Sequence, residues 1–348
     1  MNILHLVNRV EDAGNGITNV AVDVACEQAR LGHRVIVGSA GGSFVPLLAE
    51  AGVEHVHIDF TRRDPLAVLR AIGTVRRTVR GYGIDVVHVH TITPVVVARA
   101  AAPRTRLVAT VHNEYQRGVS IMRIADVVVG VSEAVSESIR RWRGPRPVIR
   151  TVYNGVLGTS RRSGSIRNPV SPPTIVTIGA VSPRKGSDVL LDAFARVVEA
   201  VPQAELLFIG NVDWPEELRR REGLAYMSKV RFAGFERDPQ RFLDRGTLFV
   251  MPSRRDPFPL ALLEAMGAGC AIVGSDVDGI PEALGGGAAG IVVPPGDSVA
   301  LAQALVDLLE HPELRSQYAA AALEASARFT VSTMASEYLD VYRLKRRP

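Results

Sequence analysis

The sequence predicts an α/β fold with two doubly wound parallel-sheet domains. Short apolar segments rich in Val, Ile and Leu alternate along the chain with stretches of helical periodicity. The alternation stops once, near residue 157, and starts again near residue 174. The chain has 348 residues, enough for about two domains. Segments that are apolar on both faces are typical of parallel strands covered by helices.

The first domain is expected over residues 1–157. Helical periodicity is clearest at 18–31 and 65–80. The predicted strands are 3–7, 34–37, 55–58, 85–89, 107–111, 127–131 and 148–152.

A linker is expected over residues 158–173, which are rich in Gly, Ser, Pro and Arg. A second domain follows over 174–325, and a helical tail over 326–348 is expected to pack back across both domains. In open α/β sheets ligands bind beyond the carboxyl ends of the strands, so the site is expected in the cleft where the two sheets face each other. The predicted strands of this half are 174–178, 204–209, 230–233, 247–251, 271–274 and 290–293.

The composition excludes several classes of protein. Apolar residues make up 47% and charged residues 22%, which excludes a disordered chain, a collagen and a coiled coil. The two cysteines, Cys26 and Cys270, form neither a disulfide framework nor a zinc-knuckle spacing. No segment has the pattern of a signal peptide or a membrane span, so a cytoplasmic protein is expected.

A glycine turn over residues 14–19 follows the first predicted strand and opens a helix. It resembles a dinucleotide fingerprint, but Asn19 stands where the third glycine is needed, and no carboxylate ends the second strand. NAD is therefore not expected. A helix N-terminus still suits a phosphate or a sugar oxygen, and a simple tight turn is the alternative.

Histidines mark the ends of two neighbouring strands. His88 and His90 share one face of a strand, and His112 ends the next strand. A His-x-His pair can begin a metal site, and Asp276 with Asp278 forms another such pair, but neither comes with enough further ligands. We therefore expect no metal, and expect His90 and His112 to line the cleft.

Residues 179–186 leave a predicted strand and open a helix at 187–200. Lys185 carries a compact positive charge, and the planar guanidinium of Arg184 can form two parallel hydrogen bonds to a phosphate. Beside a helix N-terminus, these two cations suit a diphosphate. A solvated loop is the alternative interpretation.

The segment 252–269 contains two carboxylates eight residues apart, at the start of a helix. Asp256 lies in the loop, Pro259 near the helix start and Glu264 on the helix. The spacing suits a ligand rich in hydroxyl groups, and the amides of residues 260–262 are expected to be free for an anion.

Taken together, these motifs resemble retaining glycosyltransferases of family 4, which have the GT-B fold of two Rossmann-like domains. The resemblance covers the whole chain, and each motif is weak alone but specific in this order. Its further motifs are Gly32-His33-Arg34-Val35, Asp85 to His90, Thr110-Val111-His112, Tyr153-Asn154-Gly155-Val156, Lys185-Gly186 and Phe232-Ala233-Gly234.

The resemblance implies a role for each site residue. Glu264 resembles the glutamate that binds the ribose of the donor, and Asp256 stands where the family usually has the first glutamate of E-x7-E, which holds the donor sugar. Lys185 resembles the lysine that neutralises the leaving diphosphate, while Ala180 replaces a usual arginine, a role that Arg184 could take over. The remaining candidates are His112 against the donor sugar; Gly16, Asn15, Gly179, Phe258, Pro259, Leu260 and Ala261 on the donor side; and His90, Asn113 and Glu114 on the acceptor side.

The expected reaction moves a sugar from a nucleotide-diphosphate sugar, with UDP as the expected nucleotide, to a hydroxyl group. The acceptor would be a lipid-linked sugar, a polysaccharide or a small molecule such as a natural product. A catalytically degenerate GT-B binding protein is the non-enzyme alternative, because Ala180 and Asp256 depart from the family pattern.

Arginines dominate the first half of the chain. Residues 1–170 hold 22 arginines, no lysine and 13 acidic residues. Such clusters could seat the protein on an anionic membrane at the inner face, or could be a solvated surface. Nucleic acid is not expected, because no reading motif accompanies the arginines. The clusters are Arg62, Arg63, Arg70, Arg76, Arg77 and Arg80, and Arg140, Arg141, Arg143 and Arg146 around Trp142.

Overall fold

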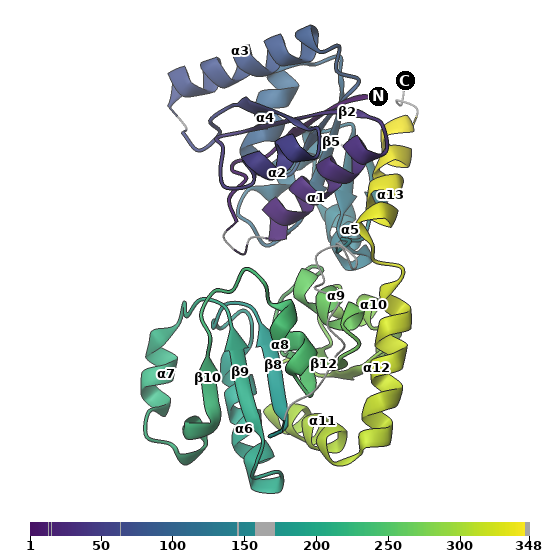
Figure 1. Cartoon of the computed structure of the whole chain (residues 1–348). Coiled ribbons are helices and arrows are strands. Elements are labelled where there is room, and N and C mark those ends of the chain that lie inside the picture. The colour runs from purple at the N-terminus through teal and green to yellow at the C-terminus, as the bar shows by residue number, and fades with distance from the viewer. Residues whose placement is uncertain (13, 15, 63, 145, 157–170, 345–348) are drawn as a thin grey trace. The chain divides into compact units, whose positions relative to one another are not determined.

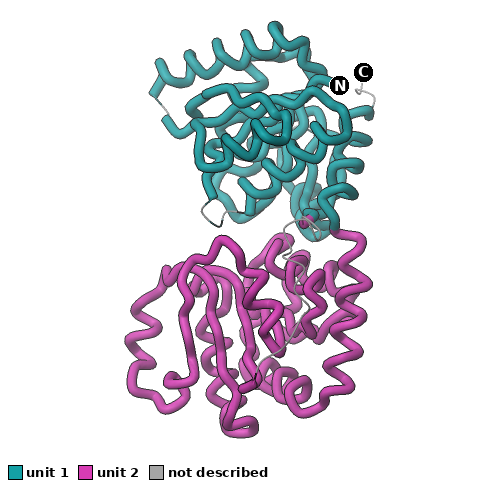
Figure 2. The backbone as a smooth tube through the Cα atoms, in the orientation of Figure 1, with its two compact units in different colours: residues 1–155, 330–348 teal, residues 156–329 magenta. Residues whose placement is uncertain are grey.

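The computed structural model describes residues 1–12, 14, 16–62, 64–144, 146–156 and 171–344. The chain forms two compact units (Figure 2). Unit 1 comprises Met1–Gly155 and Thr330–Pro348, and unit 2 comprises Val156–Phe329. Most of the expected linker, residues 158–170, lies outside the described residues.

Unit 1 is built on a seven-stranded sheet in which every strand pair is parallel (Figure 1). The order is β3-β2-β1-β4-β5-β6-β7. The chain adds β2 and β3 on one side of β1 and then crosses back to add β4 on the other side. Because parallel crossover connections are right-handed, the helices before and after this reversal cover opposite faces of the sheet. The strands are β1 Asn2–Leu6, β2 Arg34–Ser39, β3 Glu54–His57, β4 Val86–Val89, β5 Arg106–Val111, β6 Val127–Gly130 and β7 Val148–Thr151.

The helices of unit 1 follow from local sequence signals. Helix α3 begins after Asp64, whose carboxylate accepts a hydrogen bond from the amide of Ala67, and Ser132 caps α5 in the same way. The helices are α1 Gly16–Arg30, α2 Val45–Glu50, α3 Pro65–Gly81, α4 Ile92–Ala101, α5 Glu133–Arg141 and α13 Val331–Arg343, with one short 3₁₀ helix, η1 Val119–Ile124.

The last helix belongs to unit 1. Thr330 caps α13 at its start, and α13 packs against α1. Its buried residues include Tyr338 and Tyr342, which reach the sheet. The sequence prediction treated 326–348 as a separate tail, whereas the structure divides the chain at Thr330 and leaves the preceding helix in unit 2.

Unit 2 is built on a six-stranded sheet, also parallel throughout, in the order β10-β9-β8-β11-β12-β13. Its order reverses between β8 and β11. The core lies where α6 and α11 pack together against the sheet (Figure 1). The strands are β8 Thr174–Ile178, β9 Glu205–Ile209, β10 Val230–Phe232, β11 Leu248–Met251, β12 Ala271–Ser275 and β13 Ile291–Val293.

The described α-helices of unit 2 range from four to fifteen residues in length. They are α6 Ser187–Ala200, α7 Pro215–Arg221, α8 Gln240–Arg245, α9 Leu260–Gly267, α10 Ile280–Ala283, α11 Ser298–Glu310 and α12 Pro312–Ser326, with the 3₁₀ helices η2 Ala225–Lys229 and η3 Gly285–Gly287. Two doubly wound parallel-sheet units confirm the predicted fold class.

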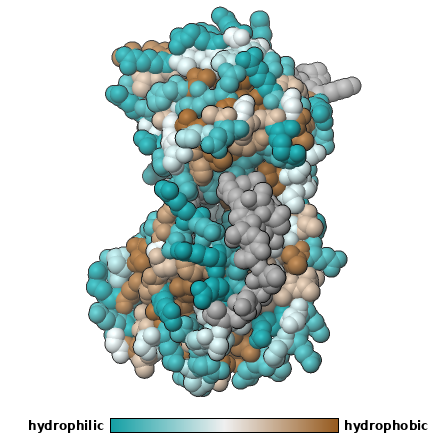
Figure 3. All heavy atoms as spheres, viewed as in Figure 1, coloured by the Kyte–Doolittle hydropathy of each residue, from teal (hydrophilic) through white to brown (hydrophobic). Residues whose placement is uncertain are grey.

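Polar and apolar side chains are interspersed over both units on the face drawn in Figure 3. Within the described residues, no helix has the length and apolar character that crossing a bilayer requires.

Candidate functional site

The two loops that leave the switch point of the unit 2 sheet carry most of the predicted donor residues. One follows β8 and the other follows β11, the strands between which the sheet order reverses. Ligands of doubly wound sheets bind at this point, because the two loops diverge there and leave a crevice. The β8 loop brings Arg184 and Lys185, and the β11 loop brings Asp256.

Lys185 and Asp256 form an ion pair across these loops. The ammonium lies 2.5 Å from Asp256 Oδ2, and Asp256 is only 6% exposed. The hydroxyl of Ser253 donates to the same oxygen at 3.2 Å. The structure therefore brings together a cation and a carboxylate that the sequence placed in separate motifs.

Asp278 supports Asp256 from a third loop. Asp278 Oδ2 accepts a hydrogen bond from the backbone amide of Asp256 at 2.6 Å. Its φ angle is +48°, which makes it the single non-glycine residue with positive φ in the described part of the chain. From the sequence, Asp278 was considered as a metal-like pair with Asp276 and as part of a second turn into a helix, but no contact with Asp256 was predicted. The Asp-Gly turn before a helix was the signal that could have pointed to this role.

Arg184 and its neighbour Arg254 join the same two loops. Arg184 Nη1 donates to the carbonyl of Arg255 at 3.1 Å, and the amide of Arg254 donates to the carbonyl of Arg184 at 2.8 Å. Arg254 also forms a two-pronged ion pair with Asp188 on α6, with both bonds at 2.7 Å. Arg184 is exposed, so its charge remains open to solvent beside the lysine.

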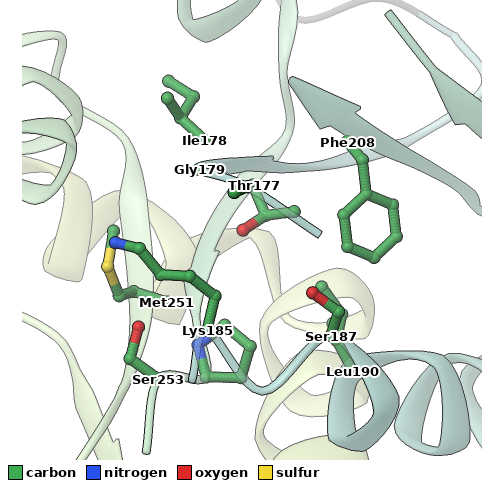
Figure 4. Close-up of a pocket in the computed structure, with 11 residues that line it drawn as sticks. Thr177, Ile178, Gly179, Lys185, Ser187, Leu190, Phe208, Met251 and Ser253 are labelled. Carbon is green, nitrogen blue, oxygen red and sulfur yellow. The ribbon is translucent and has the colours of Figure 1, made fainter. Parts of the chain in front are cut away.

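Two glycines allow the loops to approach closely. Gly186 has φ +67° and precedes α6, and a Cβ there would overlap the carbonyl oxygen of Pro252. Gly179 has φ +145°, and a Cβ there would lie 3.2 Å from Lys185 Cε. Gly179 lines a small pocket between β8, α6 and β11, along which Lys185 extends (Figure 4).

Helix α9 begins beside Asp256. Pro259 precedes its first residue, Leu260, and the amide of Leu262 donates to the carbonyl of Pro259 at 3.2 Å. Sequence analysis expected the amides of residues 260–262 to be free, but Leu262 closes the first turn. Within the described residues, only the amides of Leu260 and Ala261 remain for an anion at this helix start.

Two other candidates, one in the loop before α9 and one on the helix, differ in what they can contact. The ring of Phe258 is 3% exposed and packs edge-on against Phe329, with ring centroids 5.3 Å apart. Phe258 therefore holds the loop in the unit 2 core and can meet a ligand only through its backbone. Glu264 lies partly exposed on α9, eight residues after Asp256 along the chain.

In unit 1, the corresponding switch point lies between β1 and β4. Helix α1 begins at Gly16 after this point, and Gly14 adopts φ +67° in the turn before it. Asn15 lies outside the described residues. Thr91, after β4, donates to Asn8 Oδ1 after β1 at 3.0 Å, so these two loops are also joined.

His112 lies at the end of β5, partly buried, with its Nε2 3.1 Å from His90 Nδ1. Burial lowers the pKa of His112 to about 3, so the imidazole is neutral at neutral pH. The carboxamide oxygen of the next residue, Asn113, accepts from the amide of Tyr115 at 3.0 Å in a turn, and Glu114 is partly buried there.

His90 does not face outward as sequence analysis expected. It is 2% exposed, and both of its ring nitrogens are bonded, to His5 at 3.0 Å and to His112 at 3.1 Å. His88 and His90 point to the same face of the sheet, as predicted. That face, however, is buried beneath α1 and α13. His90 therefore stands behind His112 and cannot meet an acceptor itself.

Three buried histidines have the spacing of a metal site. The available ring nitrogens of His5, His88 and His90 lie within 4.8 Å of one another. Each nitrogen already has a protein partner, however: His88 bonds Tyr342 and Thr110, and His5 bonds Gln28 and His90. A metal would have to displace these hydrogen bonds, so the donor set does not fit a resident ion.

Two Rossmann-like units, one with a cation–carboxylate pair and a helix start at its switch point, define the GT-B class of glycosyltransferases. Residues 14–156 match the model of the family described as Glycosyltransferase Family 4, and residues 172–311 match the one described as Glycosyl transferases group 1. The chain belongs to glycosyltransferase family 4 and is a glycosyltransferase.

The similar curated proteins include phosphatidyl-myo-inositol mannosyltransferases of mycobacteria. That of Mycobacterium leprae is 34% identical over 252 residues, which cover 68% of this chain and 66% of the relative. That of Mycobacterium tuberculosis H37Rv is 32% identical, over 68% of this chain and 67% of the relative. That of Mycolicibacterium smegmatis is 28% identical over 98% of this chain and 88% of its own length.

Solved structures share the fold over nearly the whole chain. A glycosyltransferase from Rickettsia africae aligns with a TM-score of 0.85 at 20% identity, covering 98% of this chain and 97% of its own. Anabaena Alr3699/HepE, solved in complex with UDP and glucose, aligns with a TM-score of 0.79 at 22% identity, over 98% of this chain and 99% of its own.

Proposed function

We propose that this chain is a retaining glycosyltransferase that takes a sugar from a nucleotide-diphosphate sugar bound to unit 2. The observation that carries the proposal is the Lys185–Asp256 pair beside the start of α9. The glycosyl C–O bond of the donor breaks, a new bond forms to the acceptor oxygen, and the acceptor proton is released. The retained configuration is proposed from the family resemblance.

The donor site offers one group for each part of the ligand. Lys185 and the amides of Leu260 and Ala261 supply positive potential for the diphosphate, where charge grows as the bond breaks. Asp256 would receive sugar hydroxyls, and Glu264 on α9 would receive the ribose diol. In the bound state Lys185 then shares its charge between Asp256 and the leaving oxygen.

These groups would stabilise the leaving group without a metal ion. A fixed ammonium and oriented amides supply the charge that Mg²⁺ supplies in other transferases. Arg184 adds a second exposed cation on the same loop, and it is the residue that we propose compensates for Ala180.

We propose that the acceptor is a hydroxyl on a phosphate-bearing glycolipid, which unit 1 binds near an anionic membrane. The relatives named above act on phosphatidyl-myo-inositol, which supports this class. Unit 1 also contains a pocket lined by Arg123, Arg140, Trp142, Arg143 and Arg146. Apolar and cationic side chains together are typical of surfaces that bind anionic lipid.

Several arginines of the expected clusters have structural partners instead. Arg76 donates to the carbonyls of Ala100 and Ala101 at the end of α4, and Arg140 pairs with Glu133 at 2.5 Å. Arg63 lies outside the described residues. Arg143 and Arg146, both exposed, are therefore the cations we propose for the lipid phosphate.

The decisive experiment measures thermal stability with UDP, GDP, ADP, dTDP or NAD, each with and without EDTA. We expect one nucleoside diphosphate to raise the melting temperature, with no effect of NAD or EDTA, and we expect UDP to be that nucleotide. A ligand at one hundred times its Kd stabilises by about 2.7 kcal/mol, which is a shift of several degrees. A response that disappears in EDTA would refute the metal-free site, and no response to any diphosphate would refute the donor site.

Sedimentation with phosphatidylinositol vesicles tests the acceptor side. Wild-type protein should bind anionic vesicles and lose that binding in high salt, because exposed charges are screened. A double variant, Arg143→Gln with Arg146→Gln, should bind less, while Arg231→Gln in unit 2 serves as the control. Equal binding by both variants would contradict the proposed surface.

A further inference from the structure

A line of buried hydrogen bonds runs from the interior of unit 1 to His112. Gln28 on α1 places its carboxamide oxygen 2.8 Å from His5 Nε2. His5 Nδ1 lies 3.0 Å from His90 Nε2, and His90 Nδ1 lies 3.1 Å from His112 Nε2. Gln28 and His5 are fully buried and His90 is 2% exposed. The line therefore has no solvent contact until it reaches His112.

A second branch shares the same glutamine. Gln28 Nε2 donates to the hydroxyl of Tyr342 at 3.2 Å, and that hydroxyl lies 2.6 Å from His88 Nδ1. His88 Nε2 then meets Thr110 Oγ1 at 2.7 Å, and Thr110 meets Tyr338 at 3.0 Å. The contacts with Tyr342 and His5 define the orientation of the Gln28 carboxamide. Its NH2 group donates to Tyr342, and its oxygen faces His5.

The histidines of the line are neutral. Burial lowers the pKa of His5 to about 4 and that of His112 to about 3, and it holds the pKa of His90 well below its ordinary value. A neutral imidazole has one N–H donor and one acceptor nitrogen. Each hydrogen bond in the line consequently dictates the direction of the next.

The direction follows from the amide of Gln28. A carbonyl oxygen can only accept, so His5 must carry its proton on Nε2 and accept at Nδ1. His90 must then donate from Nε2 and accept at Nδ1, which requires His112 to donate from Nε2. The remaining nitrogen of His112, Nδ1, has no hydrogen-bond partner among the residues that the structure describes.

We propose that Gln28, acting through His5 and His90, is a positioning residue that sets the tautomer of His112, so that Nδ1 presents a lone pair to a hydroxyl of the bound sugar. The role of His112 against the sugar rests on the proposed function, whereas its tautomer does not. The opposite amide orientation of Gln28 would reverse every bond in the line and turn Nδ1 into a donor. His112 would then donate to an oxygen of the ligand, whereas in the observed orientation it accepts a hydrogen bond from a hydroxyl.

The first test is ¹⁵N NMR of the histidine side chains in the full chain at neutral pH, with His112 assigned from a His112→Asn sample. Imidazole ¹⁵N shifts and couplings separate a protonated from a bare ring nitrogen. We expect wild-type His112 to be neutral, with its proton on Nε2. A proton on Nδ1 would overturn the proposal, and the tautomer itself is read from the wild-type protein.

The second test compares two variants of equal size change. His5→Phe cuts the line between Gln28 and His90, whereas His55→Phe makes the same change on β3 of the same sheet, where the imidazole bonds Ser39 and belongs to neither branch. We expect His5→Phe to give His112 mixed tautomers and to raise the KM for the donor about fivefold, the effect of about one neutral hydrogen bond. His55→Phe should leave both readouts as in the wild type.

The outcomes separate the two proposals. A wild-type tautomer in His5→Phe would overturn the inference, because His90 alone would then suffice. Mixed tautomers in both variants would also overturn it, since the effect would then reflect general loosening. The expected NMR pattern without any sugar transfer would support the tautomer assignment and refute the proposed function.

Discussion

The ammonium of Lys185 lies 2.5 Å from the carboxylate of Asp256, although 71 residues separate them along the chain. The two loops that carry them leave neighbouring strands, β8 and β11, at the point where the sheet order reverses. The chain topology, rather than any local motif, therefore creates the pair.

Replacing Lys185 by Ala should lower turnover by about 100- to 1000-fold, the cost of removing one oriented charge from a developing anion. The fold should persist, because Ser253 still donates to Asp256. Steady-state transfer rates and circular dichroism check this. Lys229→Ala is the matched control, since Lys229 is the other lysine in the described part of unit 2 and lies away from the switch point. A Lys185→Ala rate near that of the wild type would sink the donor-site assignment.

Asp278→Ala should reduce transfer about tenfold, because the amide of Asp256 loses its acceptor and the carboxylate is no longer held in place. Asp278→Asn should retain most of the activity. Asparagine keeps an acceptor oxygen and tolerates the φ of +48° that this position requires. Rates of the two variants at saturating donor provide the comparison, and equal losses would argue against the buttressing role.

Glu264→Gln should weaken binding of the nucleoside diphosphate about tenfold, since a charge-assisted hydrogen bond to the ribose becomes a neutral one. Calorimetric titration of the nucleotide gives the Kd directly. The variant should change KM more than kcat, because ribose contacts are made in both the ground state and the transition state. A loss confined to kcat would place Glu264 at the reacting centre.

The sequence predicted the sheets well and the interior of unit 1 poorly. Strands apolar on both faces, such as β4, can be recognised from a few residues, because parallel sheets buried under helices demand this pattern. The pairing of His88 with Tyr342 joins positions 254 residues apart. No local rule connects a strand near residue 88 with a helix near residue 342. From the sequence, the C-terminal helices were expected to pack back, but the side chains of α13 that reach the sheet could therefore not be predicted.

The donor motifs were recognised as separate pieces, and only the folded chain shows how they support one another. Lys185 and Asp256 were both selected from the sequence, yet their contact depends on the sheet order. Neither Asp278 nor Gln28 was selected as a site residue, because each acts on another residue that only the fold brings next to it.

Tyr342→Phe should destabilise unit 1 by about 1–3 kcal/mol, because it leaves the buried Gln28 Nε2 and His88 Nδ1 without their shared partner. The same change at Tyr82, whose hydroxyl makes an exposed hydrogen bond to Glu54 in unit 1, serves as the control. Urea unfolding followed by Trp142 fluorescence, in a Trp214→Phe background, reports unit 1 alone. A free energy of unfolding unchanged by Tyr342→Phe would contradict the buried network.

The buried histidines should make unit 1 sensitive to acid. Burial lowers the pKa of His5 from 6.5 to about 4 and holds those of His88 and His90 well below 6.5. Below pH 6.5 these histidines bind protons in the unfolded chain but stay neutral in the folded chain. Their contribution to the free energy of unfolding is therefore fully present above pH 6.5 and is lost as the pH falls toward 4. Each such histidine contributes a slope of about 1.4 kcal/mol per pH unit over this window.

Urea unfolding of the same single-tryptophan protein between pH 7 and pH 5 measures that slope. Carboxylates titrate mainly below this range, so the histidines dominate the change. His88→Phe removes one of these histidines, so the free energy of unfolding of this variant should fall less steeply as the pH decreases. The difference in slope should be about that of a single buried histidine. The stability of the variant at pH 7 should be lower, because Tyr342 and Thr110 lose their partner, yet the two curves should converge toward pH 5. Parallel curves would mean that His88 takes up its proton over the same pH range in the folded and the unfolded chain, and the neutral network would then be wrong.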